Sequence, residues 1–386
     1  MSASLDALSK NLIDDQCKNL RNMYSGEQFK LIRRKGVFSY EYIDSVGRLN
    51  DNKLPSKPAF YSKLSGSDIS DEDYKHACAV WEEFKCKTLG DYLEVYNKSD
   101  VLILADVFEN FRNLCMREYE LDPAWYYTVP GLAWHAALRC TGGVLELISD
   151  VDMLLMVQVG IRGGMCSAPN RRVKANNKYM EKAYNPKQPS KFITYLDANN
   201  LYGWAMSQPL PTHGFEWMSD DWLKDWRNMP NGEGCTLEVD LEYDKKLHDL
   251  HNDFPLAPEN KIPPGSIATV KKLISDLNNK EKYVVHHQTL KIYERLGLKV
   301  TRVHRGIKYC ESPWLKPYID KNTTLRTGAT NNFEKDLFKL LNNSVFGKTI
   351  QNVEKYVDMK LVCDRERAIK LSAKTNFEDM TFLMRI

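Results

Sequence analysis

The segment 331–347 has the pattern of an amphipathic helix, and this pattern constrains the chain more than any other feature. Asn331 or Asn332 can cap its first turn, which carries Glu334, and Gly347 stands where such a helix would end. Its apolar face is formed by Phe333, Leu337 and Leu340 or Leu341. We therefore expect a helix that packs on one side only.

The opposite face of this helix carries Lys335, Lys339 and Asn343 at intervals of four residues. Two ammonium groups and an amide on adjacent turns suit a ligand with several negative oxygens, such as a triphosphate. A charged stripe is more often an ordinary solvated face. Spacing alone therefore leaves both interpretations open.

Length and composition indicate a globular protein of about two or three domains, with 386 residues of which 43% are apolar. The formal net charge is only +3, so any affinity for nucleic acid must come from local clusters of basic residues. Nine scattered cysteines without a C-x-x-C pair indicate reduced thiols. No apolar run reaches the ~18 residues of a membrane span, and the N-terminus lacks a secretory pattern, so we expect an intracellular protein without a membrane partner.

The first third of the chain has a helical pattern that a loop near residues 35–58 interrupts. Ser70 is a capping residue for a helix towards Phe84, and a longer helix is expected from about Leu89 to Glu118. One stripe of the longer helix consists of Tyr92, Tyr96, Asp100, Leu104 and Phe108. Asp100 is the charged exception in that stripe.

The middle of the chain contains two predicted strands. The run 192–196 is β-prone and ends at Asp197, and 235–243 alternates apolar and acidic residues. A basic linker precedes the first strand, and its cations are Arg162, Arg171, Arg172, Lys174, Lys178, Lys182, Lys187 and Lys191. Basic residues also exceed acidic ones between Lys299 and Arg326. We read Asp150 as a helix cap.

The string 339–347, KLLNNSVFG, resembles the K-x-x-x-N-S-x-Y-G motif on the fingers helix of B-family DNA polymerases. The resemblance implies that Lys335, Lys339, Asn343 and Phe346 bind the incoming nucleotide. It implies that Ser344 and Gly347 contact DNA.

The string 197–203, DANNLYG, is similar to the D-x-x-S-L-Y-P motif at the end of a palm strand in the same family. The resemblance implies that Asp197 is catalytic and binds Mg²⁺ in a two-ion site. It implies that Tyr202 excludes a ribose 2′-hydroxyl. Asn200 replaces serine and Gly203 replaces proline, and without the other motif the segment reads as a turn.

Two further motifs precede these. Tyr96 and Asp100 resemble the Y-x-x-x-D motif of the attached 3′–5′ exonuclease, which implies that Asp100 is a catalytic metal ligand and that Tyr96 orients the attacking water. Ile161 to Gly164 resembles the Y-x-G-G motif of protein-primed members, which implies that Arg162, Gly163 and Gly164 contact DNA. A helical tyrosine beside an aspartate and a plain Gly-Gly turn are the simpler explanations.

The wider sequence resembles polymerases of Maverick/Polinton-type transposable elements and their viral relatives, which act in the nucleus or at viral replication sites. The implied fold class is α+β. It comprises part of an RNase H-like exonuclease domain (1–135), a palm with an antiparallel sheet (136–245), an insertion that contacts a terminal protein primer (246–318), fingers helices (319–350) and a return to the palm (351–386). The implied partners are primer-template DNA and dNTP.

The third palm motif of this family, Asp-x-Asp after the fingers, does not occur among the 39 residues after Gly347. We therefore expect a polymerase fragment that extends a primer negligibly alone, because a two-ion site needs both carboxylates. A non-catalytic nucleic-acid-binding remnant is the alternative function. A nuclease is disfavoured because the first two exonuclease motifs are not found before Asp100.

Overall fold

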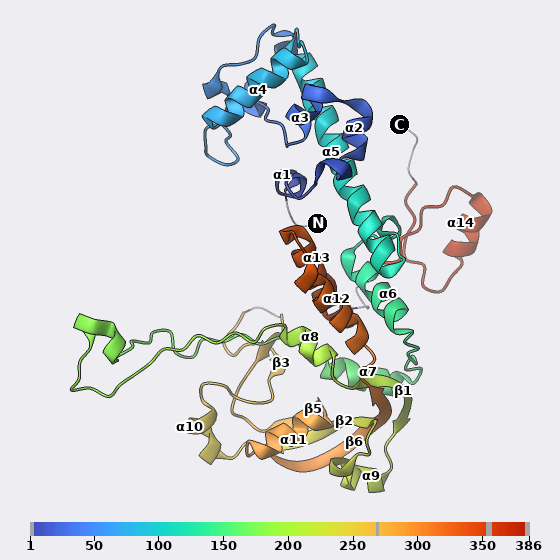
Figure 1. Cartoon of the computed structure of the whole chain (residues 1–386). Helices are drawn as coiled ribbons and strands as arrows, with labels where there is room; N and C mark the ends of the chain where they lie inside the picture. The colour runs from blue at the N-terminus through green and yellow to red at the C-terminus, as the bar shows by residue number, and fades with distance from the viewer. Residues whose placement is uncertain (1–3, 268–269, 353–356, 383–386) are drawn as a thin grey trace. The chain divides into compact units, whose positions relative to one another are not determined.

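The computed structural model describes residues 4–267, 270–352 and 357–382 (Figure 1). The chain divides into two compact units, residues 1–349 and 350–386. Within its described part, the second unit contains one helix, α14 (Arg365–Ser372), which begins where Asp364 accepts a hydrogen bond from the Arg367 amide. No described helix has the length and apolar character that crossing a membrane requires.

The N-terminal part of the first unit is helical, as the sequence predicts. Its helices are α1 (Leu5–Ser9), α2 (Lys18–Met23), α3 (Gly26–Ile32), α4 (Asp71–Glu83), α5 (Leu89–Tyr119) and α6 (Val129–Thr141). Ser70 caps α4 by accepting a hydrogen bond from the Asp73 amide at 3.0 Å, and Thr88 caps α5 in the same way. Both predicted helix starts are confirmed.

The buried face of α5 moves around the helix along its length. Tyr92 and Tyr96 are buried, but Leu104 is 52% and Phe108 36% exposed, and the core is continued by Ile103 instead. Four residues of an α-helix turn through about 400°, so a stripe spaced by four drifts ~40° at each step. The predicted stripe therefore leaves the core after two turns.

The second half of the first unit combines a sheet with helices. The remaining helices are α7 (Val151–Gly160), α8 (Leu201–Met206), α9 (Asp220–Lys224), α10 (His248–His251), α11 (His287–Arg295), α12 (Lys316–Gly328) and α13 (Asn332–Thr349). The strands are β1 (Leu210–Trp217), β2 (Glu233–Glu242), β3 (Glu259–Lys261), β4 (Lys272–Ile274), β5 (Lys280–His286) and β6 (Lys299–Ser312).

Four antiparallel strands form the main sheet in the order β1-β6-β2-β5. The predicted strand 235–243 is confirmed as β2, whose apolar residues Leu237, Val239 and Leu241 are almost completely buried. On that face they cluster with Leu290 of α11. Met153 and Met156 of α7 cluster with residues of β5 and β6, so a helix packs on each side of the sheet.

The predicted strand 192–196 is wrong, because no strand forms there. Its side chains are exposed, from 60% for Ile193 to 91% for Tyr195. Within the described chain this segment is paired only at its start, through an isolated bridge between Asn176 and Lys191. A β-prone run becomes a strand only where a neighbour supplies the ladder hydrogen bonds and a packing surface.

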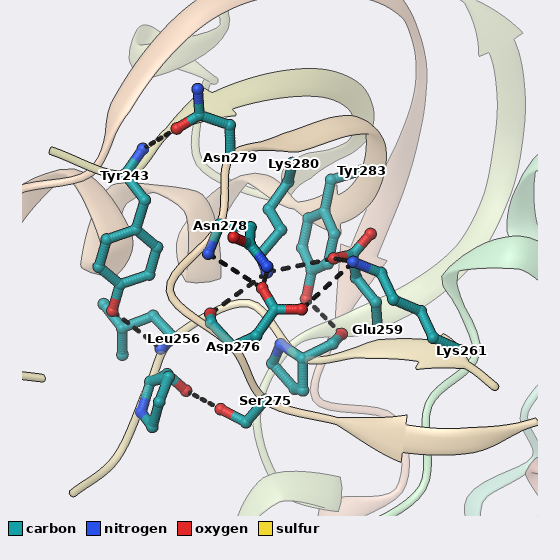
Figure 2. A network of polar contacts seen from close by, with 12 residues as sticks. Tyr243, Leu256, Glu259, Lys261, Ser275, Asp276, Asn278, Asn279, Lys280 and Tyr283 are labelled. Atoms are coloured by element: carbon teal, nitrogen blue, oxygen red, sulfur yellow. Dashed lines mark hydrogen bonds and ion pairs between the residues drawn. The ribbon is translucent and has the colours of Figure 1, made fainter. Parts of the chain in front are cut away.

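The predicted domain boundary between residues 245 and 246 divides the strands of the main sheet. β2 precedes this boundary, whereas its two neighbours in the sheet, β5 and β6, follow it. Residues 255–261 and 275–280 are attached to the sheet by a polar network (Figure 2). The ammonium group of Lys280 is buried and forms ion pairs with Asp276 and, at 3.1 Å, with Glu259. Lys261 pairs with both carboxylates from the other side.

The network makes stability depend on pH. Burial alone would raise the pKa of the Asp276 carboxyl, but hydrogen bonds from Lys280 and the Asn278 amide and the two lysine charges lower this pKa to about 2 from 3.8. The stabilisation is therefore present above pH ~4 and lost as the pH falls towards 2, with a magnitude of about 2 kcal/mol.

We expect the difference in free energy of unfolding between wild type and Asp276→Asn to shrink as the pH falls from 5 to 2.5. Urea unfolding at each pH measures this difference. Asp249→Asn, at an exposed carboxylate without a described ion pair, is the control. A difference for Asp276→Asn that stays constant over this range would contradict the assignment.

Candidate functional site

A pocket of about 290 Å³ lies where α12, α13 and the start of α8 meet. Its lining residues are Asn200, Thr323, Arg326, Thr327, Lys335, Lys339 and Asn342. Two of the predicted nucleotide-binding lysines therefore share one pocket with the segment that carries Asp197.

The pocket is strongly cationic. Within the described residues, the side chains of Arg326, Lys335 and Lys339 have no ion-pair partner. Three cations around one small cavity are available for an anionic ligand with several oxygens. Arg326 was predicted only as one of many basic residues, because the sequence does not reveal that α12 returns beside α13.

The apolar face of α13 fixes the direction of its polar face. Leu337, Phe338, Leu341 and Val345 are buried in a core shared with α5, α6 and α12. Asn331 accepts a hydrogen bond from the Glu334 amide at 2.9 Å, which confirms the predicted cap. The helix continues past Gly347 to Thr349, so the predicted stop is two residues early.

A buried chain of hydrogen bonds connects three helices behind the pocket. The Tyr119 hydroxyl of α5 donates to the Asn322 side-chain oxygen at 2.6 Å, and the Asn322 amide donates to the Asn342 side-chain oxygen at 2.7 Å. Burial raises the pKa of the Tyr119 hydroxyl, so this group remains a donor. Asn342 thus lines the pocket while its own position is fixed from behind.

The predicted residue Asn343 is only partly buried and does not line the pocket; its neighbour Asn342 does. Ser344 is buried at 7% exposure, whereas Gly347 is exposed.

Replacement of Asn322 by leucine would leave the Tyr119 hydroxyl and the Asn342 amide unpaired in the core. We expect Asn322→Leu to lower the free energy of unfolding by about 2–5 kcal/mol. The triple variant Tyr119→Phe/Asn322→Leu/Asn342→Leu, which removes all three side chains of this hydrogen-bonded chain, should recover much of this loss in urea unfolding. Wild-type stability of Asn322→Leu would contradict the assignment.

The two departures from the D-x-x-S-L-Y-P pattern compensate one another. Asn200 precedes α8 with a left-handed backbone (φ 55°), which asparagine adopts more readily than most residues. A Cβ atom on Gly203 would lie 2.7 Å from Cγ of Asn200. The Asn200 side chain therefore occupies the space that a Cβ at position 203 would need, and it must move when one is added.

We expect Gly203→Ala to push the Asn200 side chain out of its place at the pocket, at a cost of only about 0.5 kcal/mol because this side chain is exposed. The same change in an Asn200→Ser background should cost much less, because serine lacks the clashing amide. A double-mutant cycle of urea unfolding measures the coupling, and additive effects of the two changes would rule out the steric link.

Tyr202 of α8 stacks on Phe346 of α13, with ring centroids 4.3 Å apart and planes 21° apart. A Cβ atom on Gly164 would lie 3.8 Å from the Tyr202 hydroxyl oxygen. Three motifs that are far apart in the sequence are thus adjacent here. The structure brings together Gly164, Tyr202 and Phe346 of the predicted site.

Asp197 is exposed and precedes Asn200 by three residues, so its Cα lies within about 11 Å of the Cα of Asn200. Among the residues described, no group of three or more His, Cys, Asp or Glu side chains is arranged to hold a metal ion. Mg²⁺ is commonly held by one or two carboxylates together with substrate phosphates. A single carboxylate in the segment that borders a cationic pocket has the donor chemistry for an ion that arrives with a phosphate ligand.

Arg162 has a structural role that the sequence did not predict. Its guanidinium donates to the carbonyl oxygens of Gly160 and Val284, at 3.1 and 2.7 Å, and lies 4.0 Å from the centroid of the Tyr283 ring. These contacts join the end of α7 to β5. Gly163, next to it, is exposed.

Tyr96 and Asp100 lie together on α5, as predicted, and Lys35 binds both. The Lys35 ammonium contacts the Asp100 carboxylate and the Tyr96 hydroxyl, and Tyr40 contacts that hydroxyl as well. Burial raises the pKa of the Tyr40 hydroxyl to about 12. This pair is therefore joined by a lysine, and within the described chain it belongs to no group of three or more His, Cys, Asp or Glu side chains that could hold a metal ion.

The structure is a mixed α/β fold with a pocket lined by three cations that have no ion-pair partner in the described chain. Residues 17–379 match the family model for DNA polymerase type B, organellar and viral. The chain belongs to this family.

Solved structures of Phi29 DNA polymerase are similar to parts of the chain. One, an orthorhombic crystal form, has 14% identity and a TM-score of 0.42, covering 82% of this chain and 48% of that one. A ternary complex with primer-template DNA and incoming nucleotide has 15% identity and a TM-score of 0.40, covering 84% and 50%. The chain thus spans about half the length of these polymerases. No curated protein sequence matches it.

Proposed function

We propose that this chain contains the nucleotide-binding part of a DNA-directed DNA polymerase. The observation that carries the proposal is the pocket in which Arg326, Lys335 and Lys339 lie without ion-pair partners in the described chain, next to the segment of Asp197. The pocket binds the triphosphate of a deoxynucleotide. The family to which the chain belongs supports this assignment.

Each group around the pocket has a distinct task. The three cations bind the phosphate oxygens, and the Asn200 amide is placed to donate a hydrogen bond from the opposite side. Tyr202 and Phe346 stack on each other and join α8 to α13 beside the pocket. We assign to this pair of rings the role of an apolar wall that packs against the sugar and excludes a 2′-hydroxyl. Asn343 and Ser344 support α13, and Gly163, Gly164 and Gly347 allow the DNA backbone to approach.

Asp197 would hold Mg²⁺ together with the phosphates. The ion would lower the pKa of a primer 3′-hydroxyl and neutralise the charge that develops on the leaving pyrophosphate. Asp197 itself would orient that ion towards the primer end. The proposal assigns no metal-dependent nuclease step to Tyr96 and Asp100, because Lys35 already neutralises the Asp100 carboxylate.

The proposed domains follow from the same assignment. The helices before residue 136 derive from the exonuclease domain, the main sheet belongs to the palm, and α12 and α13 are the fingers. The part of 246–318 that lies outside β5 and β6 holds the region that would contact a terminal protein primer. These polymerases of transposable elements and viruses act at the site of DNA replication, in the nucleus or a viral replication site.

Removal of one pocket cation weakens a charge-assisted contact to phosphate, which is worth about 1.5–3 kcal/mol. We expect Lys339→Gln and Arg326→Gln each to lower the affinity for dATP with Mg²⁺ by about 10- to 100-fold in calorimetric titrations. Lys18→Gln, at an exposed lysine of α2, is the control and should bind as wild type does.

A comparison of the affinities for dATP, dAMP and ATP tests the proposed function. The proposal requires dATP to bind more tightly than dAMP, and ATP to bind more weakly than dATP until Tyr202→Ala removes the wall. Binding of DNA without any metal-dependent affinity for dATP would refute it and support the alternative of a non-catalytic nucleic-acid-binding module.

A further inference from the structure

The loop between α7 and α8 has a large local excess of positive charge. Between residues 163 and 196 there are seven cations, Arg171, Arg172, Lys174, Lys178, Lys182, Lys187 and Lys191, and one acid, Glu181. This segment has a net charge of +6, whereas the whole chain has +3, so the rest of the chain is net negative at −3. All seven cations are exposed, and within the described chain none forms an ion pair.

The basic segment is an ordered loop although it lacks strands. Asn176 and Lys191 form two backbone hydrogen bonds, at 2.9 and 2.7 Å, that close a loop of residues 176–191. The Asn176 side chain then binds inside the loop, donating to the carbonyl oxygens of Asn185 and Pro189 and accepting from the Asn185 amide. Asn177 donates to the Lys191 carbonyl oxygen in addition.

These contacts make Asn176 the centre of the loop. It is 9% exposed, whereas most of the residues around it are exposed. With its interior filled by one amide, the loop directs its charged side chains outward. Such a compact loop with adjacent ends holds cations in fixed positions at low entropic cost on binding.

Two aromatic rings accompany the cations. Tyr179 is 75% and Phe192 61% exposed, and their rings meet edge to face at 6.5 Å. The Lys178 ammonium lies 5.3 Å from the centroid of the Tyr179 ring. Exposed aromatic rings can stack on unpaired bases, and the neighbouring cations can bind phosphates. The bases of a duplex are already stacked on each other, so a duplex would use only the phosphate contacts.

We propose that the loop 176–191, with Tyr179 and Phe192, binds single-stranded DNA and guides an unpaired template strand towards Asp197. Phe192 lies five residues before Asp197, so the Cα atoms of these two residues are at most about 18 Å apart. This inference deepens the proposed function and rests on it for the identity of the strand.

Salt dependence of binding tests the charge. Each phosphate contact to single-stranded DNA contributes about 0.7 to the slope of log affinity against log salt concentration. We expect Lys178→Gln/Lys182→Gln/Lys187→Gln to reduce the slope for oligo(dT) by about two. The control Lys18→Gln/Lys245→Gln/Lys246→Gln removes the same charge at exposed lysines elsewhere and should leave the slope unchanged.

Substitution of Tyr179 tests the choice of strand. Tyr179→Ala should weaken oligo(dT) binding about tenfold, Tyr179→Phe should not, and neither should alter binding of a blunt duplex. Asn176→Ala keeps every charge but removes the side-chain hydrogen bonds inside the loop, so it should also weaken binding of oligo(dT). The control Gln188→Ala should bind oligo(dT) as wild type does.

The outcomes separate this inference from the proposed function. An unchanged salt slope in the triple lysine variant overturns the inference. So does a Tyr179→Ala variant that loses as much affinity for the duplex as for oligo(dT). A wild-type protein that binds oligoglutamate as tightly as oligo(dT) overturns it as well. The loop triple variant should bind dATP with Mg²⁺ as wild type does. Loss of dATP binding in that variant would show that the loop and the pocket are not separate sites.

Discussion

The buried hydrogen bonds from Tyr119 through Asn322 to Asn342 are the constraint on which the site depends. They are surrounded by apolar side chains of α5, α6, α12 and α13, where an unpaired polar group is costly. Apolar packing alone permits small shifts of one helix along another. These hydrogen bonds form only when α5, α12 and α13 lie in one relative register. With that register fixed, Lys335 and Lys339 face Arg326 across the pocket.

The same helix pair explains how the motifs meet. Phe346 lies one turn beyond Asn342 on α13 and stacks on Tyr202, and Tyr202 in turn lies at Gly164. The main sheet supports the segment of Gly164, because α7 packs on this sheet and Arg162 joins the end of α7 to β5. Arg162 thus places the following glycines, which is a different task from the DNA contact that its motif suggested.

Local physics made much of the fold predictable. Capping residues located the starts of α4, α7 and α13, and two-residue alternation located β2, because caps and periodicity act within a few residues. The segment 192–196 has the same β-prone composition but no ladder partner in the described chain, so the prediction failed. Spacing placed Lys335 and Lys339 on one polar helix face, and both line the pocket. Arg326 and Asn342 join them only through the packing of α12 on α13, which no local pattern encodes.

A crystal structure of the chain with dATP and Mn²⁺ tests the central claim most directly. The account predicts the triphosphate between α12 and α13, within hydrogen-bond distance of Arg326, Lys335 and Lys339, with an anomalous peak for Mn²⁺ at the Asp197 carboxylate. A nucleotide bound elsewhere with this pocket free of phosphate, or Mn²⁺ bound away from Asp197, would contradict it.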